Sequence, residues 1–525
     1  MLFTDLIAHL DYIPKFLKQT TLQLSSFSCR MTEPANYEAI LKSIGGFGRY
    51  QLYVYFWLIP TLLVLAGNMG YMTFGRLPPP VLTNESMSFM ENISDHPQQK
   101  VQFYSVAMEW NLIDDLVYIP AMMISVQMIG ILVGCLAISQ ISDRFGRRPA
   151  FFFSFLGMLV TGTASAFCWN WQTFIALRFF LGLTMGGSMN TYFVWVTELL
   201  LPKHRLMLQL GGWPLGYTYM AVVAKIFQHW SSSLIAVQAP GVLAVFMGLF
   251  VQESPKWLLE RGDKTKADAV FAKIARWNGA RWAGVAQAEK IALTESKVKM
   301  LSFWNLFYSR QATINLMVLC VMWWETGTAY FGITFNLGDL AGDVALNTIY
   351  IFVARGILQG LLVLADYKFK WLTRRLVFLS ACSLATLCFS FSIIAYWIHL
   401  DVSQPSVLRA VTLTGIMALG LQWSIVTTCT VELIPTLLRT MGFSLGSVAA
   451  RIGGIIAPQI FLLFTIYKPA PYIVISLCSM TCLLVTFFGL QETKGKPLPD
   501  LPDKYKAKLD KDNILLDQVT AMVKA

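Results

Sequence analysis

The feature that most restricts how this chain folds is a series of about twelve apolar runs, each close to the length that crosses a bilayer. They lie near 52–72, 118–139, 150–169, 173–199, 207–228, 233–251, 312–335, 345–365, 376–398, 407–430, 440–464 and 470–490. Backbone polar groups inside lipid must bond within their own segment, so each run is predicted to be a transmembrane helix. The sequence therefore predicts an all-α integral membrane protein with twelve spans.

Composition agrees with this assignment and excludes several other classes of protein. Of 525 residues, 55% are hydrophobic and 14% are charged, whereas soluble globular chains are about 25% charged. The net charge of +11 does not indicate a nucleic-acid partner, because the basic residues lie mostly in loops that are predicted to be cytosolic. Metal-ligand spacings, phosphate-binding loops and nucleophile motifs are not found, so we expect no metal, no cofactor and no enzymatic activity.

A short basic loop after the second run sets the orientation of all the spans. It holds Asp143 and three arginines, Arg144, Arg147 and Arg148. Lys and Arg beside a span resist translocation, so this loop is predicted to be cytosolic. Both termini then lie in the cytosol, and the polar stretch 73–116 lies outside the cell.

The outer stretch and the loops divide the chain into parts. Two glycosylation sequons begin at Asn84 and Asn92 within the outer stretch, so we expect glycans there. That stretch holds none of the nine cysteines, so we expect no extracellular disulfide framework. The predicted parts are a cytoplasmic N-terminus (1–47), a first six-helix bundle (48–251), a cytoplasmic loop (252–311), a second six-helix bundle (312–490) and a cytoplasmic tail (491–525).

The two halves of the chain repeat one pattern of charges at an offset of roughly 220 to 240 residues. The matching features are Asp143 before Arg147-Arg148 and Asp366 before Arg374-Arg375, Glu198 and Glu432 at the ends of the fourth spans, and Glu253 and Glu492 after the sixth. Such a parallel internal repeat is typical of transporters built from two similar bundles around a central cavity.

The motifs resemble those of a known superfamily. Ser139 followed by Asp143-Arg144, Gly146 and Arg147-Arg148 is similar to the Gly-x-x-x-Asp-Arg-x-Gly-Arg-Arg loop of major facilitator transporters. Further motifs resemble the organic cation/anion/zwitterion transporter family: Glu109-Trp110-Asn111-Leu112, Val196-Thr197-Glu198, Glu253-Ser254-Pro255-Lys256-Trp257, Glu432-Leu433-Ile434-Pro435-Thr436, Arg451-Ile452-Gly453-Gly454 and Glu492-Thr493-Lys494-Gly495. The resemblance runs from about residue 37 to about residue 502. It departs at Asp366-Tyr367-Lys368-Phe369-Lys370, where the family repeats the basic motif.

The resemblance implies a plasma-membrane transporter that moves small organic ions by alternating access. It also implies a cytosolic charge latch, whose ion pairs differ between the two states and break on opening inward. The latch candidates are Asp143, Arg144, Arg147, Arg148, Glu198, Arg205, Glu253, Glu432 and Arg439. The alternative is that these charges only set the topology.

Ionisable residues within spans are costly and therefore indicate function. Arg451 and Arg355 lie deep in the second half, and a guanidinium grips a carboxylate or sulfonate with two hydrogen bonds. In the resembling family, arginine at the position of Arg451 marks carriers of organic anions or of the zwitterion carnitine, whereas cation carriers have an acid there. We therefore expect an anionic or zwitterionic substrate, bound by Arg451 and Arg355 with Tyr217, Tyr330 and Phe331.

Glu325 has three interpretations in the sequence. It is a structural ion-pair partner of Arg355 or Arg451, a protonation site, or the counter-charge of a cationic substrate. Arg178, in the fourth span, is expected to hold that helix in register. Lys225, near the outer end of the fifth span, is expected to extend to the membrane surface.

Two rival functions remain open at this point. The first is an organic cation carrier, in which Glu325 attracts the substrate. The second is a non-transporting membrane sensor or scaffold, which the altered loop after Asp366 favours. The expected partners are a small organic ion, the lipid bilayer and a coupled ion or exchange solute, with no nucleic acid.

Overall fold

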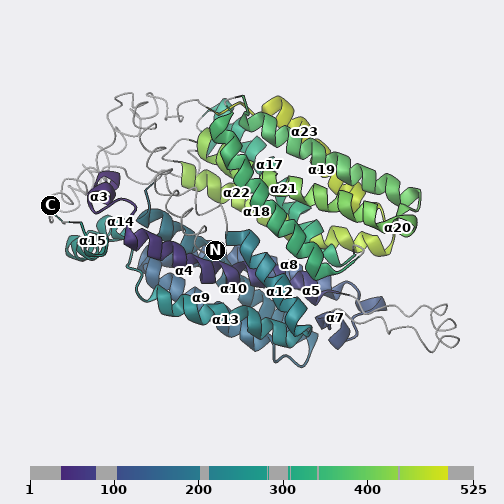
Figure 1. Cartoon of the computed structure of the whole chain (residues 1–525), viewed down its shortest axis with the longest axis horizontal. Helices are drawn as coiled ribbons and strands as arrows, with labels where there is room; N and C mark the ends of the chain where they lie inside the picture. The colour runs from purple at the N-terminus through teal and green to yellow at the C-terminus, as the bar shows by residue number, and fades with distance from the viewer. Residues whose placement is uncertain are drawn as a thin grey trace, which may run out of the picture.

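The computed structural model describes residues 37–77, 103–201, 212–280, 282, 306–307, 309–339, 342–369, 371–434 and 438–494, which are almost entirely helical (Figure 1). In this part of the chain twelve helices have 16 to 29 residues, one in each predicted span. Nine helices of the described residues are long and apolar enough to cross a membrane. The predicted all-α membrane fold is therefore confirmed.

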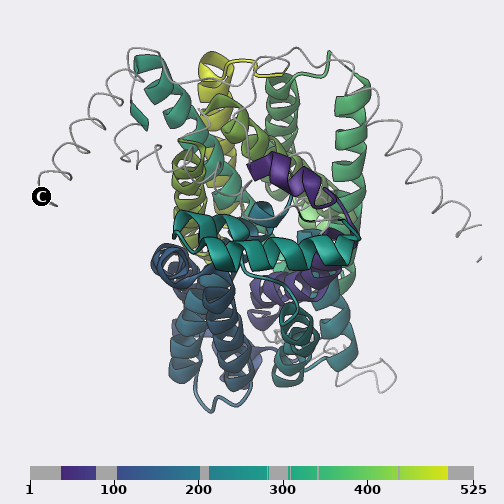
Figure 2. The same cartoon turned by 90° about the vertical axis from the view of Figure 1, so that its left-hand side faces the viewer.

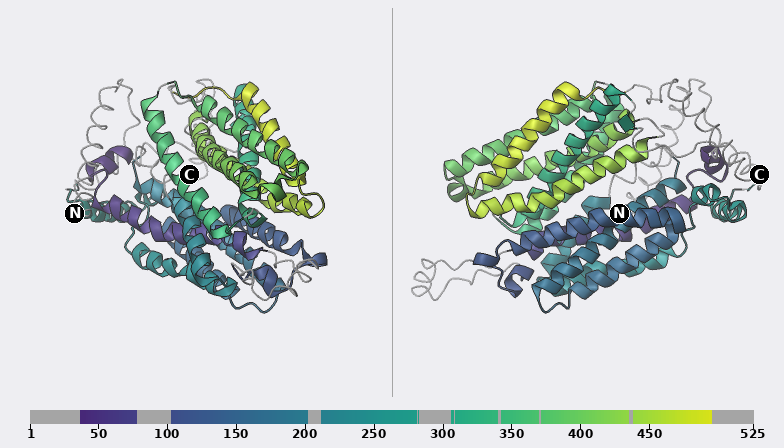
Figure 3. Two further views of the ribbon diagram at one scale, coloured as in Figure 1. Left: turned by 45° about the vertical axis from the view of Figure 1, so that its right-hand side comes forward. Right: turned by 180° about the vertical axis from the view of Figure 1, so that it is seen from behind.

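The long helices form two bundles, drawn in purple to teal and in green to yellow (Figures 1 and 3). The first bundle consists of α4 (Arg49–Gly70), α8 (Ile119–Phe145), α9 (Arg147–Ser165), α10 (Trp171–Leu199), α12 (Gly212–Phe227) and α13 (Trp230–Gly248). The second consists of α17 (Arg310–Phe335), α18 (Val344–Lys368), α19 (Arg374–Trp397), α21 (Pro405–Leu433), α22 (Arg439–Leu462) and α23 (Ala470–Gly489).

The two ends of the molecule differ in their short elements. One end, here called the basic end, carries α3 (Tyr37–Ser43), α14 (Pro255–Glu260) and α15 (Lys264–Asn278). The other, here called the loop end, carries α5 (Met72–Gly75), α7 (Val106–Glu109) and α20 (Leu400–Ser403). Seen from the basic end, α3 and α15 lie across the long helices (Figure 2). Asn278 ties α15 to α4, because its Oδ1 accepts from the backbone N–H of Tyr50 at 3.0 Å.

Short polar side chains begin several of the long helices. Asn170, Ser309 and Thr373 each accept a hydrogen bond from a backbone N–H in the first turn of α10, α17 and α19. Asp343 does the same for α18, accepting from two N–H groups at 2.9 and 3.2 Å. These caps satisfy donors that have no partner inside the helix, so each helix starts at a defined residue.

Two pairs of glycines bring α8 and α10 together along their backbones. Gly130 and Gly134 on α8 face Gly182 and Gly186 on α10, each pair four residues apart. A Cβ on Gly134 would lie only 1.9 Å from the carbonyl oxygen of Leu183. Small residues at this spacing let membrane helices approach closely, so no larger side chain fits here.

The bundles are fastened to each other at the loop end. Thr73 donates to the carbonyl of Thr334 at 3.2 Å, and Ser125 donates to the carbonyl of Ile455 at 2.7 Å. Lys225 of α12 forms an ion pair with Asp343, the residue that caps α18. Toward the basic end the bundles diverge (Figures 1 and 3).

The glycine contact yields a stability prediction with a matched control. We expect Gly134→Ala to destabilise the protein by about 2 kcal/mol or more, because the new methyl group overlaps the backbone of α10. Gly360→Ala, on α18, meets nothing within 4 Å and should change stability by no more than about 1 kcal/mol. Thermal unfolding of detergent-purified variants measures both. Equal midpoints for the two variants would contradict the close packing of α8 and α10.

Candidate functional site

At the basic end of the first bundle, Arg147 joins two acidic side chains. Its guanidinium contacts Asp143, one turn earlier in the chain, and its Nε lies 3.3 Å from Oε2 of Glu198 at the end of α10. Glu253 accepts hydrogen bonds from the backbone N–H groups of Arg147 and Arg148 at 3.1 to 3.2 Å. This carboxylate therefore caps the N-terminus of α9, where the helix dipole favours negative charge.

The turn between α8 and α9 explains why glycine stands at position 146. Gly146 has φ of 114°, a conformation that other residues adopt at a cost. A Cβ there would also lie 2.6 Å from Oε2 of Glu253. The glycine thus lets the capping carboxylate reach the helix.

The second bundle repeats this arrangement with different loop residues. Arg374 contacts Asp366 at 2.5 Å and Glu432 at 3.3 Å. Glu492 accepts from the backbone N–H groups of Arg374 at 3.1 Å and Arg375 at 3.2 Å. The echo of charges in the sequence therefore corresponds to two equivalent networks, one in each bundle.

Lys494 binds the end of α18 at the loop that departs from the family motif. Its Nζ lies 2.9 Å from Oδ1 of Asp366. It also donates to the carbonyls of Asp366, Phe369 and Leu372 at 2.9 to 3.0 Å. A lysine from the end of the second bundle thus caps the C-terminus of α18, where cations are favourable. Sequence reasoning missed this role, because Lys494 follows the loop by more than a hundred residues.

The described ion pairs of the predicted latch lie within a bundle and not between the bundles. Arg148 donates to the carbonyl of Leu249 at 2.7 Å, and the guanidinium of Arg144 lies over the ring of Phe145. Arg205, Asn84 and Asn92 lie outside the described residues, as does the side chain of Arg439, which begins α22. The pairs made by Arg147 are formed while the bundles diverge at this end, so they do not require the closed state.

Midway between the two ends, Arg451 of α22 lies at the boundary between the bundles. Its Nη2 is 4.0 Å from Sδ of Met189 on α10, and its Cζ is 5.9 Å from the ring centroid of Phe331 on α17. The residue is 7% exposed, and its Nε has no hydrogen-bond partner in the described structure. The guanidinium is therefore enclosed by side chains of both bundles.

Arg355 of α18 approaches the same boundary. Its Nη1 contacts the hydroxyl of Tyr330, and its Cζ lies 4.7 Å from the centre of that ring. Tyr217 of α12 stacks on Phe352 of α18 with ring centroids 4.2 Å apart. Gly420 on α21 leaves room for the arginine, because a Cβ there would lie 2.8 Å from Nε of Arg355.

Three buried donors at this boundary have no hydrogen-bond partner among the described residues. They are Tyr217 Oη, Arg355 Nε and Arg451 Nε. Tyr217 lies within electrostatic range of both guanidiniums. In the described part of the chain, neither arginine has a carboxylate within 4.0 Å. The site is therefore positively charged and supplies donors, which suits an anionic group.

Glu325 is not brought together with the other predicted substrate residues. Its carboxyl group is fully buried in the second bundle and accepts from the hydroxyl of Ser479 on α23 at 2.6 Å. The ion pair with Arg355 or Arg451, one of the three interpretations, is not formed in the described structure. Glu325 also lies away from the bundle boundary, where the counter-charge of a cationic substrate would be needed.

Arg178 is fully buried in the first bundle. Its guanidinium lies between the rings of Tyr71 and Phe174, 4.5 Å from each centroid, and none of its three nitrogens has a hydrogen-bond partner among the described residues. Such stacking holds α10 against the junction of α4 and α5. The expected role of Arg178 in helix register stays a prediction.

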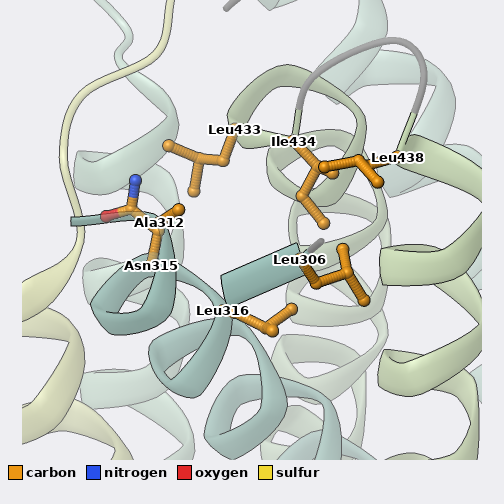
Figure 4. Close-up of a pocket in the computed structure, with 7 residues that line it drawn as sticks. All are labelled: Leu306, Ala312, Asn315, Leu316, Leu433, Ile434 and Leu438. Carbon is orange, nitrogen blue, oxygen red and sulfur yellow. The ribbon is translucent and has the colours of Figure 1, made fainter. Parts of the chain in front are cut away.

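A small apolar pocket opens at the basic end of the second bundle (Figure 4). Its lining residues are Leu306, Ala312, Asn315, Leu316, Leu433, Ile434 and Leu438. It includes one polar side chain, no charged one and none of the central arginines. This pocket therefore does not suit an organic ion.

Comparison with known proteins gives a consistent result. The model of the sugar (and other) transporter family matches residues 83–505. The human organic cation/carnitine transporter 2 is 29% identical over 421 residues, covering 77% of this chain and 72% of that protein. A solute carrier family 22 member 15-like protein of Xenopus tropicalis is 26% identical over 443 residues, covering 83% and 89%.

Solved structures show the same fold. The xylose transporter XylE from E. coli, in a partially occluded inward open conformation, superimposes with a TM-score of 0.61. It is 15% identical and covers 85% of this chain and 100% of the XylE chain. Two helical bundles, a repeated charge network and a family match over most of the sequence lead to one conclusion. The chain belongs to the sugar (and other) transporter family and is a membrane transporter of the major facilitator superfamily.

Proposed function

We propose that the protein is a secondary transporter of small organic anions or zwitterions, which works by alternating access in the plasma membrane. One observation carries this proposal: the guanidiniums of Arg355 and Arg451 lie at the boundary of the bundles without a carboxylate partner. A buried charge without a partner costs several kcal/mol, and a bound anion removes that cost. The substrate is therefore the missing counter-charge.

The surroundings of the arginines favour an anion that also has an apolar or aromatic part. The rings of Tyr330, Phe331 and Trp423 are in mutual contact beside the two guanidiniums, at centroid distances of 5.6 to 5.9 Å. Tyr217 and Met189 come from the first bundle, whereas both arginines belong to the second. A substrate held between them touches both moving parts, as alternating access requires.

Relatives support a zwitterion as one of the substrates. The human relative is named as an organic cation/carnitine transporter, and carnitine combines a carboxylate with a quaternary ammonium. The rival function, a carrier of simple organic cations, is less well supported, because Glu325 lies away from both arginines and is bonded to Ser479.

The orientation follows from the distribution of charge. Arg147, Arg148, Arg374 and Arg375 gather at the basic end, which is therefore proposed to face the cytosol, with both termini. The loop end, where the bundles are fastened, then faces outside, so the described state is open inward. Glycosylation at the outer sequons is part of the same proposal.

Reversing the charge at the central arginine tests the substrate class. We expect Arg451→Asp to lower uptake of a labelled aromatic sulfonate and of labelled carnitine at least about tenfold, because a carboxylate repels the group that the guanidinium attracts. Uptake of a labelled quaternary amine should not fall. Transport is measured in cells and normalised to protein at the surface.

Arg276→Asp provides the matched control, because it makes the same charge change on the exposed face of α15. This variant should transport at the wild-type rate. If the wild-type protein takes up the quaternary amine but neither the sulfonate nor carnitine, the proposal is contradicted. Absence of all uptake from protein at the surface would favour the non-transporting alternative.

The networks at the basic end are proposed to hold the helix ends of each bundle together during the transport cycle, because their described ion pairs lie within one bundle and are already formed where the bundles diverge. Asp143 is the informative member, because its side chain is 70% exposed whereas that of Glu198 is 12% exposed. An exposed ion pair contributes about 1 kcal/mol or less to stability. Loss of Asp143 should therefore disturb the cycle more than the fold.

We expect Asp143→Asn to reduce transport about tenfold while the amount of protein at the surface stays at the wild-type level. Asp263→Asn is the control, since it removes another exposed ion pair. Asp263 directly precedes α15, and its partner Lys266 lies in the first turn of that helix. A proportional fall of surface protein and transport would leave Asp143 with a role in topology only.

A further inference from the structure

Glu325 is a buried carboxyl group for which the structure offers no cation. It lies on α17 where that helix packs against α21, α22 and α23, and the whole residue is 0% exposed. In the described part of the chain no Lys, Arg or His lies within 4.0 Å of it. An unpaired carboxylate in such a place is expensive, so the group gains much by binding a proton.

The ionisable groups on the neighbouring helices do not change this conclusion. α23 has no charged residue, and its thiols within electrostatic range of Glu325 are those of Cys478 and Cys482. The charged residues of α21 and α22 are Arg409, Glu432, Arg439 and Arg451. Glu432 pairs with Arg374 at the basic end, and Arg451 points to Met189 and Phe331.

Hydroxyl groups contact both oxygens of the Glu325 carboxyl group. Ser479 donates to its Oε1 at 2.6 Å. Ser476, one turn nearer the loop end on α23, lies 2.8 Å from Oγ of Ser390 on α19. On the other side, Oγ1 of Thr326 lies 3.4 Å from both Oε2 of Glu325 and Oε1 of Gln422 on α21. Polar side chains thus lie on two sides of the carboxyl group within otherwise apolar helix packing.

We propose that Glu325 binds the proton that drives transport, so that the protein is a symporter of protons and organic anions. This inference rests on the proposed function, whose coupling ion it names. The step is the addition of one proton from the solution on the outer side to the Glu325 carboxylate, and the return of that proton to the solution on the basic-end side. No other reactant is needed.

The direction of coupling follows from charge. Tyr330 and Phe331, which contact the two central arginines, follow Glu325 by five and six residues, about 8 Å along the same helix. An ionised Glu325 weakens the positive field of Arg355 and Arg451, whereas a protonated one leaves that field intact. Proton and anion therefore increase each other's affinity, which is the requirement for symport.

Protonation can be read from the purified protein without a substrate. Infrared difference spectra taken between about pH 5 and pH 8 should show a carboxylic-acid band in the wild type that titrates and that Glu325→Gln lacks. Gln has the shape of the protonated carboxyl group, so this variant is expected to fold. Ser479→Ala removes the hydroxyl that bonds to Oε1 of Glu325 and should shift the frequency of this band, which assigns the band to Glu325.

Transport supplies the second measurement, with the aromatic sulfonate as probe because it stays ionised over this range. In proteoliposomes an inward proton gradient should accelerate wild-type uptake at least about fivefold. Glu325→Gln should lose this acceleration but keep exchange of labelled for unlabelled probe, since exchange needs no change of protonation. Wild-type pH dependence in Glu325→Gln, or a band that does not titrate, would overturn the proposal.

Two other acids serve as controls. Burial raises the pKa of Glu253 above its ordinary value, so Glu253→Gln must keep the pH dependence if Glu325 is the sensor. Burial alone would raise the pKa of Asp343 as well, but Lys225 and two backbone N–H groups hold it below its ordinary value. Asp343 therefore stays ionised at pH 5 and above, and its ion pair would be lost only in stronger acid.

The two proposals fail in different ways. Uptake that ignores the proton gradient in the wild type would overturn proton coupling and leave the anion carrier standing. A titrating Glu325 in a protein that takes up only the quaternary amine would overturn the anion preference, and with it symport. The infrared result then still distinguishes a proton site from a permanently neutral carboxyl group.

Discussion

The structure depends on the cost of leaving a charge inside a membrane protein without a partner. Water screens charges at the surface, but the boundary between the bundles is enclosed by side chains. A guanidinium is stable there only if a counter-charge or an aromatic ring interacts with it. Arg178 shows one solution, since two aromatic rings cover both its faces. Arg355 and Arg451 each have an aromatic contact and an Nε without a partner in the described structure, and these are the donors that the proposed substrate would use.

The basic end is built on the opposite principle, because two of its arginines pair with acids of their own bundle. Arg147 and Arg374 each bridge two acids, while Glu253 and Glu492 each cap the helix that follows a loop. The networks are equivalent although the loops differ in sequence. Gly146 makes the turn in the first bundle, and Lys494 secures it in the second. The same geometry is thus held by two different sets of residues.

Much of this arrangement could be predicted from the sequence, because the membrane restricts the choices. Apolar length alone located the twelve helices, and the repeated acids and arginines located the two networks. Features that depend on how each helix is rotated were not predicted. Lys225 reaches Asp343 across 118 positions of sequence, and Glu325 points to Ser479 and not to the central arginines. Hydropathy places a residue at a depth in the membrane, whereas packing decides which neighbour it faces.

The glycine contacts between α8 and α10 also have a mechanical consequence. The backbones of α8 and α10 are in close contact at four glycines and have no room to slide past each other. This pair therefore moves as one rigid unit within the first bundle. α8 carries Ser125 and α10 carries Met189, which touch the second bundle at different depths. Any tilt that releases one of these contacts must therefore shift the other, because both contacts are made by one rigid pair of helices.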